Sequence, residues 1–173
     1  MSVTHDGTTI KSMTYDEQEV KTWIHDGVRV WSKAENTAIT FSPTSMSKSG
    51  KHYPYDLNAT IYRGIDLSLY KGIQFYVSSA YIDVDNKDQS TSIGVYAYNS
   101  NTGTSIGGVG IASNHRHDVD GEKVFSPTSQ AGKTLTITFT ENTGTGEIRV
   151  VGGGTCTCDD GNWALSNAIL LAR

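Results

Sequence analysis

Alternation of apolar and polar residues in the stretch 73–79 constrains the fold of this chain most. The stretch reads Ile-Gln-Phe-Tyr-Val-Ser-Ser. A period of two is typical of a β-strand with one face against a core and the other toward solvent or a ligand. The residues expected to face the core are Ile73, Phe75 and Val77, and those expected to face outward are Gln74, Tyr76 and Ser78. We therefore expect a central strand of a β-sandwich here.

Further short segments carry the same kind of pattern, and no segment of ordinary length shows a helical period. In residues 134–140, Leu135, Ile137 and Phe139 alternate with threonines and are expected to face inward. The other expected strands are 38–41, 59–62, 92–98, 108–112, 148–151 and 168–172, and the expected loops are 82–91, 99–107, 113–123, 141–146 and 152–162. Eighteen glycines against 3 prolines, with only 18% charged residues, suit many short strands joined by turns. The sequence therefore predicts an all-β fold, an antiparallel sandwich of the jelly-roll kind.

Residues 1–33 are predicted to form a small β-hairpin module that precedes a sandwich domain of residues 38–173. The Asp-Gly pairs at 6–7 and 26–27 each lie between strand-like residues, and Asp-Gly favours the two-residue turn of a hairpin. In the second hairpin this turn would pair Trp23 with Val30, which places Trp23 and Trp31 on opposite faces. A module this small cannot bury both tryptophans alone. We expect one face to dock on the main domain or on another chain.

Residues 20–31, Val-Lys-Thr-Trp-Ile-His-Asp-Gly-Val-Arg-Val-Trp, resemble a segment common near the start of bacteriophage and prophage tail or baseplate proteins. Residues 10–15 resemble the strand that usually precedes it. The resemblance implies that the segment introduces a variable β-rich domain, which builds the tail or contacts the host surface and forms symmetric oligomers, most often trimers. An ordinary hairpin is the alternative. Residues 65–72 and the strand after them are also similar to the galactose-binding-like jelly rolls of carbohydrate-binding modules.

Charge and hydropathy limit the partners and the location. A formal net charge of −4 gives no basic surface, so non-specific nucleic-acid binding is not expected. No apolar run approaches the roughly 20 residues that span a bilayer. The first residues have neither the basic region nor the apolar core of a signal peptide. We expect synthesis in a bacterial cytoplasm without a signal peptide, no membrane insertion, and a final location in the virion.

Outward-facing tyrosines are the main candidate for a ligand or interface site. With the apolar residues of 92–98 facing inward, Tyr96 and Tyr98 would face outward, as Tyr76 does on its own strand. If these strands are neighbours, the three tyrosines form one patch edged by Gln74. Their rings suit stacking on sugars or burial in a protein interface. The alternatives are that this face is the other half of the core, or that the N-terminal hairpins cover it.

Two pairs of residues and two acidic loops are the candidate metal ligands. The pairs are His115 with His117, and Cys156 with Cys158. On a strand each pair would point to one side, and together they could supply the four ligands of a zinc site. The His-x-His spacing also resembles the iron-binding motif of trimeric phage tail spikes, and the acidic residues of 83–88 and 118–122 could offer oxygens to calcium. Exposed histidines, reduced thiols and Asx turns explain the same residues, so we expect no cofactor.

No catalytic constellation stands out. Residues 103–107 match the G-x-S-x-G pattern of serine hydrolases but lie in a loop between expected strands, not at a strand-to-helix turn. We therefore expect a non-enzymatic virion protein of the tail, baseplate or fibre that binds copies of itself, other virion proteins and, in addition, the host surface. The alternative is a carbohydrate-binding module that binds a cell-surface glycan with its tyrosines. A cell-wall hydrolase is the third hypothesis.

Overall fold

The structure is a computed structural model of the whole chain. It describes residues 34–154 and 156–173 in full, and of the first 33 residues only the backbone of six short strands. These strands pair as three hairpins: β1 (Thr4–His5) with β2 (Thr8–Thr9), β3 (Thr14–Tyr15) with β4 (Gln18–Glu19), and β5 (Thr22–His25) with β6 (Val28–Ser32). The expected β5–β6 hairpin is thus present.

The register of that hairpin differs from the expected one. Trp23 pairs with Trp31 instead of Val30, because a β-bulge lies between Trp23 and Ile24 and shifts the strand by one residue. The side chains of Trp23 and Trp31 lie outside the described residues, so the expectation that they carry contacts stays a prediction.

The main body is a sandwich of two antiparallel sheets, named here after their central strands. The β10 sheet contains β15 (Lys133–Thr138), β10 (Tyr70–Ile82), β17 (Cys158–Ala172) and, both on the far edge of β17, β7 (Thr37–Ile39) and β8 (Ser45–His52). The β11 sheet contains β13 (Glu122–Phe125) and β14 (Thr128–Ser129) beside β12 (Ser105–Val119), then β11 (Gln89–Asn99), β16 (Thr145–Gly153) and β9 (Ala59–Asp66). A short 3-10 helix, η1 (Pro54–Leu57), connects β8 to β9.

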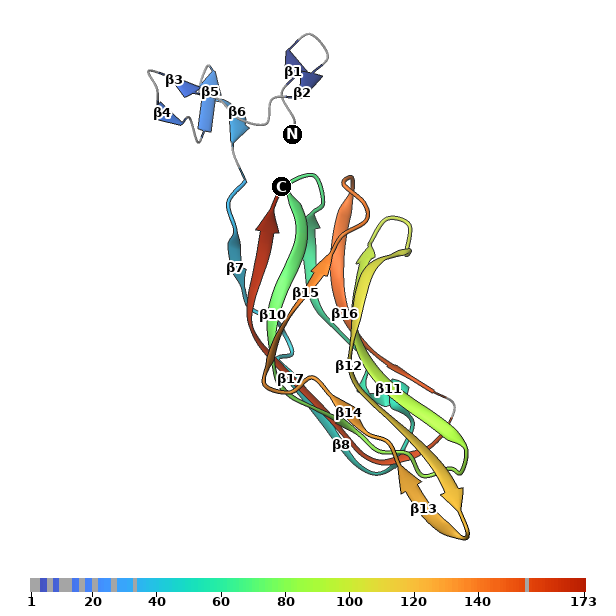
Figure 1. Cartoon of the computed structure of the whole chain (residues 1–173). Helices are drawn as coiled ribbons and strands as arrows, with labels where there is room; N and C mark the ends of the chain where they lie inside the picture. Colours follow the sequence, from blue (N-terminus) through green and yellow to red (C-terminus); the bar gives the residue numbers. More distant parts are fainter. Residues whose placement is uncertain are drawn as a thin grey trace.

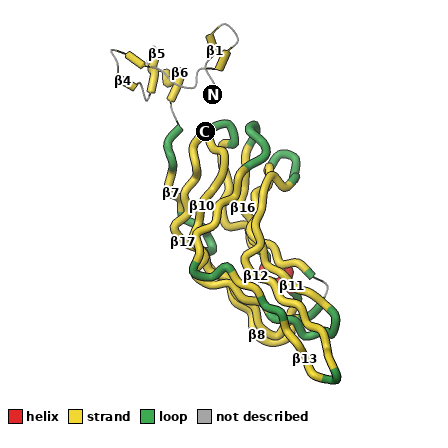
Figure 2. The backbone as a smooth tube through the Cα atoms, in the orientation of Figure 1, coloured by secondary structure: helices red, strands yellow, loops and turns green. Residues whose placement is uncertain are grey.

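The strand order identifies a jelly roll. The eight long strands lie in the orders β8-β17-β10-β15 and β9-β16-β11-β12, so all neighbours in a sheet except β11 and β12 come from distant parts of the chain. The chain changes sheet at nearly every connection, as the paired Greek keys of a jelly roll require. The predicted fold class is therefore confirmed. Figure 1 shows an elongated body with the C-terminus at one end and the β12–β13 hairpin at the other, and Figure 2 shows how little of it is helical.

Apolar side chains from both inner faces fill the space between the sheets. Ile73, Phe75 and Val77 are fully buried, as their alternation predicted. The indole of Trp163 is also fully buried, and its Nε1 donates a hydrogen bond of 2.9 Å to the carbonyl of Leu57. This bond attaches η1 to the middle of the core and satisfies the one polar atom of the indole.

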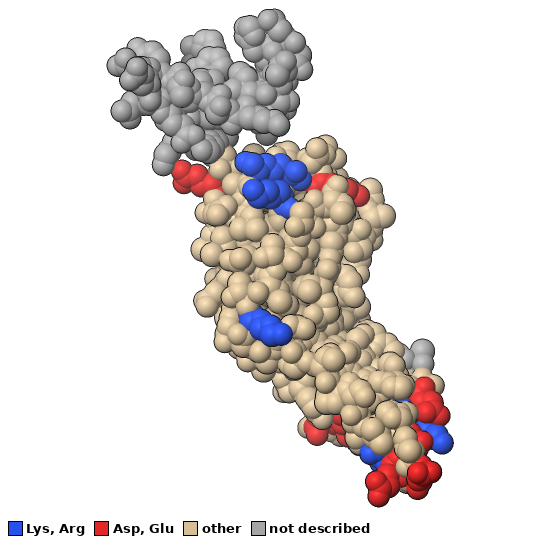
Figure 3. Space-filling view, in the orientation of Figure 1, with Lys and Arg blue, Asp and Glu red and all other residues tan. Residues whose placement is uncertain are grey.

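Several strands are longer than their apolar patterns indicated. The region 113–123, expected as a loop, is mostly the second half of β12 and the start of β13. β8, which was not predicted, has the sequence Ser-Met-Ser-Lys-Ser-Gly-Lys-His and is exposed at most positions. β8 is held by backbone pairing with β17 at the edge of its sheet, where side chains need no apolar face. The second half of β12 is paired on both sides, with β11 on one and with β13 and β14 on the other. Figure 3 shows that on the face drawn, charged side chains gather toward the two ends of the molecule.

Candidate functional site

The predicted patch of three tyrosines does not form, because the strands that carry them belong to different sheets. Tyr76 and Gln74 lie on β10, whose neighbours are β15 and β17. Tyr96 and Tyr98 lie on β11, whose neighbours are β12 and β16. Outward-facing residues of the two sheets point in opposite directions in a sandwich. Tyr76 and Gln74 are thus separate from the other two, and the Nε2 of Gln74 donates a 3.4 Å hydrogen bond to the hydroxyl of Thr136.

Tyr96 and Tyr98 instead share the outer face of the β11 sheet with charged residues of β16 and β9. We call this group, which consists of Arg63, Tyr96, Tyr98, Glu147 and Arg149, the tyrosine–arginine cluster. Register pairs Tyr98 with Glu147 and Tyr96 with Arg149. The two tyrosine rings lie 6.4 Å apart at 49° and are half-buried. The expectation that the inner face of β11 is apolar holds, since Ile93, Val95 and Ala97 are all buried.

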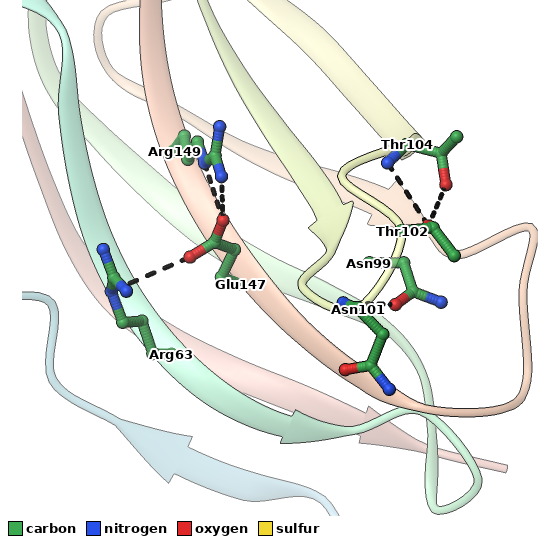
Figure 4. Close-up of polar contacts among 7 residues, drawn as sticks. All are labelled: Arg63, Asn99, Asn101, Thr102, Thr104, Glu147 and Arg149. Atoms are coloured by element: carbon green, nitrogen blue, oxygen red, sulfur yellow. Dashed lines mark hydrogen bonds and ion pairs between the residues drawn. The ribbon is translucent and has the colours of Figure 1, made fainter.

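A buried carboxylate fixes the charged part of the cluster (Figure 4). Glu147 is only 3% exposed, although it points outward from its sheet. Its Oε1 accepts a 2.8 Å hydrogen bond from Nε of Arg149 and a second from Nη2, and its Oε2 lies 3.7 Å from Nε of Arg63. The guanidinium of Arg149 also lies 4.6 Å from the centre of the Tyr98 ring. A two-donor ion pair combined with a cation–π contact leaves these side chains few alternative conformations.

Glycines fix the position of Tyr96. A Cβ atom added to Gly108 on β12 would lie 2.7 Å from Cε1 of this ring and closer still to Cδ1, and one added to Gly94 would lie 2.5 Å from Cε2. The ring therefore occupies the space that side chains on two adjacent strands would otherwise take. Beside it, Gly110 has no atom within 4 Å of its own Cβ position. Tyr96 thus lies along the sheet surface and borders an area of bare backbone.

The loop between β11 and β12 is held at the end of the cluster by short polar contacts (Figure 4). The Oδ1 of Asn99 accepts a 2.9 Å hydrogen bond from the backbone N–H of Asn101, and its Nδ2 donates to Oε2 of Glu141 at 2.5 Å. The hydroxyls of Thr102 and Thr104 are hydrogen-bonded to each other. The end of β11 that carries Tyr98 is therefore held by Asn99, which contacts both its own loop and Glu141.

The four candidate zinc ligands do not converge. The rings of His115 and His117 stack on β12 with centroids 5.7 Å apart, so the expectation that this spacing points both to one side is confirmed. Cys156 and Cys158 are both buried, and the thiol of Cys156 donates to the carbonyl of Ser90 at 3.3 Å. Within residues 34–154 and 156–173, no three His, Cys, Asp or Glu side chains are grouped to hold a metal ion. The zinc hypothesis is therefore wrong for a single chain, whereas an iron site on a trimer axis needs three copies and stays a prediction.

The calcium hypothesis is wrong for the same reason, since among the described residues no three acidic side chains of these segments are grouped to hold a metal ion. Carboxylates of these segments contact protein groups instead. The carboxylate of Asp83 accepts hydrogen bonds from the backbone N–H groups of Asp159 and Asp160, at 2.8 and 3.1 Å. Burial raises the pKa of Asp83, and these two bonds oppose the shift. Asp118, in the second acidic segment, lies on β12 and forms an ion pair of 3.0 Å with Arg116. These carboxylates therefore contact protein groups near the ends of β10, β12 and β17.

The sequence did not indicate Glu147, Arg149 or the glycines under Tyr96. The spacing Glu-x-Arg on one strand is a usable signal, because residues two apart share a face. Glycines inside strand segments are a second signal, since they mark close approach of another group to the backbone. A stacked pair of exposed tyrosines around η1, Tyr53 and Tyr55, was missed as well; their rings lie 5.0 Å apart and nearly parallel.

Comparisons with known proteins add little to this description. No protein-family model matches the chain, and no curated protein matches it. One solved structure with a similar arrangement is described as "Structure of infectious bursal disease virus Gx strain"; it has 12% sequence identity and a TM-score of 0.34. The match covers 95% of this chain and 37% of that chain. The fold assignment rests on the strand order given above and not on this similarity.

Among the described residues, no helix is both long enough and apolar enough to cross a bilayer.

Proposed function

We propose that this chain is a non-enzymatic structural protein of a bacteriophage or prophage virion, located in the tail, baseplate or fibre, that binds a partner through the outer face of its jelly roll. The observation that supports this best is the tyrosine–arginine cluster. Its aromatic rings are fixed by glycines and by a buried ion pair, and they remain partly exposed. Side chains that are ordered before contact lose little entropy on binding, which is the property of a binding surface.

The N-terminal segment supplies the virion part of the proposal. Residues 20–31 resemble tail and baseplate proteins in which such a segment leads into a variable β-rich domain. Here the hairpins precede a jelly roll, an architecture used by viral capsid and lectin domains. The arrangement suits a protein that is anchored at one end and presents its sandwich at the other.

Assembly contacts are assigned to the β12–β13 hairpin and to the N-terminal hairpins. Val119 and Val124, on one face of the β12–β13 hairpin, are 50% and 37% exposed, and Phe125, on its other face, is 46% exposed. Exposed apolar residues on a projecting hairpin are candidates for contact surfaces in soluble proteins. We propose that they contact copies of this chain or other virion proteins in a homo-oligomer, with a trimer as the expected form.

Immunogold labelling of purified particles tests the proposal. Antibodies against the chain should label one position on negatively stained particles from the bacterium that carries the gene, and light scattering should give the mass of an oligomer. Particles that lack the chain by labelling and by mass spectrometry would contradict the virion assignment.

A free-standing carbohydrate-binding module is the second candidate function. The position of Tyr96 favours it, because a half-buried ring that lies along a sheet can stack its open side on the apolar face of a sugar. A monomer by light scattering, absent from particles and bound to glycans, would support this candidate over the first.

A further inference from the structure

The outer face of the β11 sheet is one continuous strip, and the tyrosine–arginine cluster is only its first part. Rows of paired residues follow one another along β11. Tyr98 pairs with Glu147, Tyr96 with Arg149 and Gly108, Gly94 with Gly110 and Val151, and Ser92 with Ser113 and Gly153. The last row pairs Ser90 with His115. The strip therefore runs from aromatic and charged residues, across glycines, to hydroxyl groups.

Bare backbone forms the middle of the strip. Gly110 is exposed and nothing lies within 4 Å of its Cβ position, while its partner Gly94 is buried and the Tyr96 ring covers its Cβ position. A flat group can therefore approach the peptide plane next to the tyrosine. In a strand interior, glycine weakens the sheet, and a common reason for its use is close approach by a ligand or another backbone.

Hydroxyl groups surround a hollow at the far end of the strip. The hollow has a volume of about 370 Å³, and its outward-facing lining includes Ser90, Ser92, Ser113, His115 and Ser126. The hydroxyl of Ser113 is hydrogen-bonded to that of Thr128 at 2.7 Å, so one wall is already ordered. Serine hydroxyls both donate and accept, which lets one site match many hydroxyl orientations.

We propose that this strip binds a linear oligosaccharide that lies along β11, with one sugar ring stacked on Tyr96, the next over Gly110, and further hydroxyls hydrogen-bonded in the serine hollow. The inference rests on carbohydrate binding, the second candidate function, and assigns where on the molecule the ligand lies. The same binding site is compatible with a virion protein and with a free-standing carbohydrate-binding module.

The chemistry of the strip favours a saccharide over other long ligands. The charged residues of its cluster are Arg63 and Arg149, and both contact the carboxylate of Glu147. The strip therefore lacks the cationic surface that a nucleic acid requires. It lies in the middle of a sheet, where β12 and β16 already pair with the backbone of β11, so a peptide cannot add as a strand. A flat ring followed by a glycine floor and hydroxyl groups matches the apolar faces and hydroxyl edges of sugars.

The strip is long enough for several sugars. Tyr98 and Ser90 are eight positions apart on β11, and a strand rises about 3.3 Å per residue, which gives about 26 Å. We therefore expect affinity to rise with the number of sugars in the ligand, because short saccharides reach the tyrosine or the hollow but not both.

The test uses the full chain and defined oligosaccharides. An array of glucose, galactose, mannose and N-acetylglucosamine oligomers, graded from disaccharide to hexasaccharide, is screened first, and bound series are measured by titration calorimetry. We expect at least one series to bind with affinity that rises with length. Tyr96→Ala should lower that affinity about tenfold through lost stacking. Gly110→Gln should lower it similarly by filling the floor, with little change in melting temperature, since a Cβ atom at Gly110 would have no other atom within 4 Å.

Tyr76→Ala is the matched control, because Tyr76 is a half-buried, outward-facing tyrosine on the central strand of the other sheet. It should leave the affinity unchanged. If binding is unchanged in both Tyr96→Ala and Gly110→Gln, the proposal that the strip is the binding site is wrong, and the carbohydrate binds elsewhere on the molecule. If the wild-type chain binds no series, both the proposal that the strip binds an oligosaccharide and the second candidate function are wrong. That result would not bear on the virion assignment, which the particle labelling tests.

Discussion

The ring of Tyr96 lies in the space that a side chain on Gly108 would occupy, on the neighbouring strand of the same sheet. The tyrosine and the glycine are therefore one structural unit, although twelve positions separate them in the sequence. The ring can lie along the sheet only because β12 has no Cβ atom there. The position of the main candidate contact residue thus depends on a residue that itself offers no side chain.

Gly108→Ala should destabilise the protein through this contact. Its methyl group would overlap the Tyr96 ring, and forcing a ring from its place costs about 1–3 kcal/mol. Gly110→Ala is the control, because its Cβ meets nothing within 4 Å. Urea unfolding should show a lower unfolding free energy for Gly108→Ala alone, and removal of the ring in the double variant with Tyr96→Ala should recover most of the loss. Equal effects of the two alanine variants would contradict the account.

Glu147→Gln should also destabilise the protein. The substitution keeps the shape of a side chain that is 3% exposed but removes the charge that Arg149 and Arg63 contact. Loss of a largely buried, charge-assisted pair costs about 1–3 kcal/mol, and solvent around Arg149 keeps the value toward the lower end. Glu122→Gln on the exposed β13 is the control and should change the unfolding free energy by less than about 0.5 kcal/mol. A similar result for both variants would show that Glu147 does not hold the cluster.

Alternation within single strands predicted which side chains enter the core, and it did so well. Ile137 and Phe139 are buried and the four threonines between and around them are exposed. These assignments depend on a local property, because successive side chains of a strand point to opposite faces whatever the neighbouring strands are. The class of fold followed from the same local patterns.

Strand order could not be predicted from the sequence, and the prediction of a tyrosine patch was wrong for that reason. β10 and β11 follow each other in the chain, yet the connection between them crosses from one sheet to the other. Pairing partners are set by packing across the whole sandwich, so no residue near Tyr76 or Tyr96 indicates them. β8 was missed for a different reason, since its Ser- and Lys-rich sequence at a sheet edge has no apolar alternation to detect.

Cys158 should be unreactive in the folded protein. Burial, followed by the nearby charge of Asp83, raises the pKa of this thiol to about 12. At pH about 8 the thiolate fraction is then about a thousandfold smaller than for a thiol with a pKa near 9, and the thiolate is the reactive form. Burial also raises the pKa of Cys156. Mass spectrometry after iodoacetamide treatment should find neither thiol modified in buffer and both modified in urea. Rapid modification in buffer would show that the end of β17 opens readily.

Asp83 should make stability depend on pH in the direction opposite to an ordinary ion-paired carboxylate. Burial raises its pKa above 3.8 in the folded state, so the folded protein holds this proton to a higher pH than the unfolded chain does. Its contribution to stability is therefore fully present below a pH of about 3.8 and is lost as pH rises through the folded pKa. Asp83→Asn, which cannot titrate, should become more stable relative to wild type across that range.

Urea unfolding followed by tryptophan fluorescence, at a series of pH values from about 3 to about 7, measures this difference. The exposed, non-titrating Thr136→Ala on β15 serves as control, and its difference from wild type should stay constant with pH. A constant difference for Asp83→Asn as well would mean that the bonds from the N–H groups of Asp159 and Asp160 offset the burial. A difference that moves the other way would mean that those bonds dominate and that the charged form of Asp83 holds the β10–β17 end together.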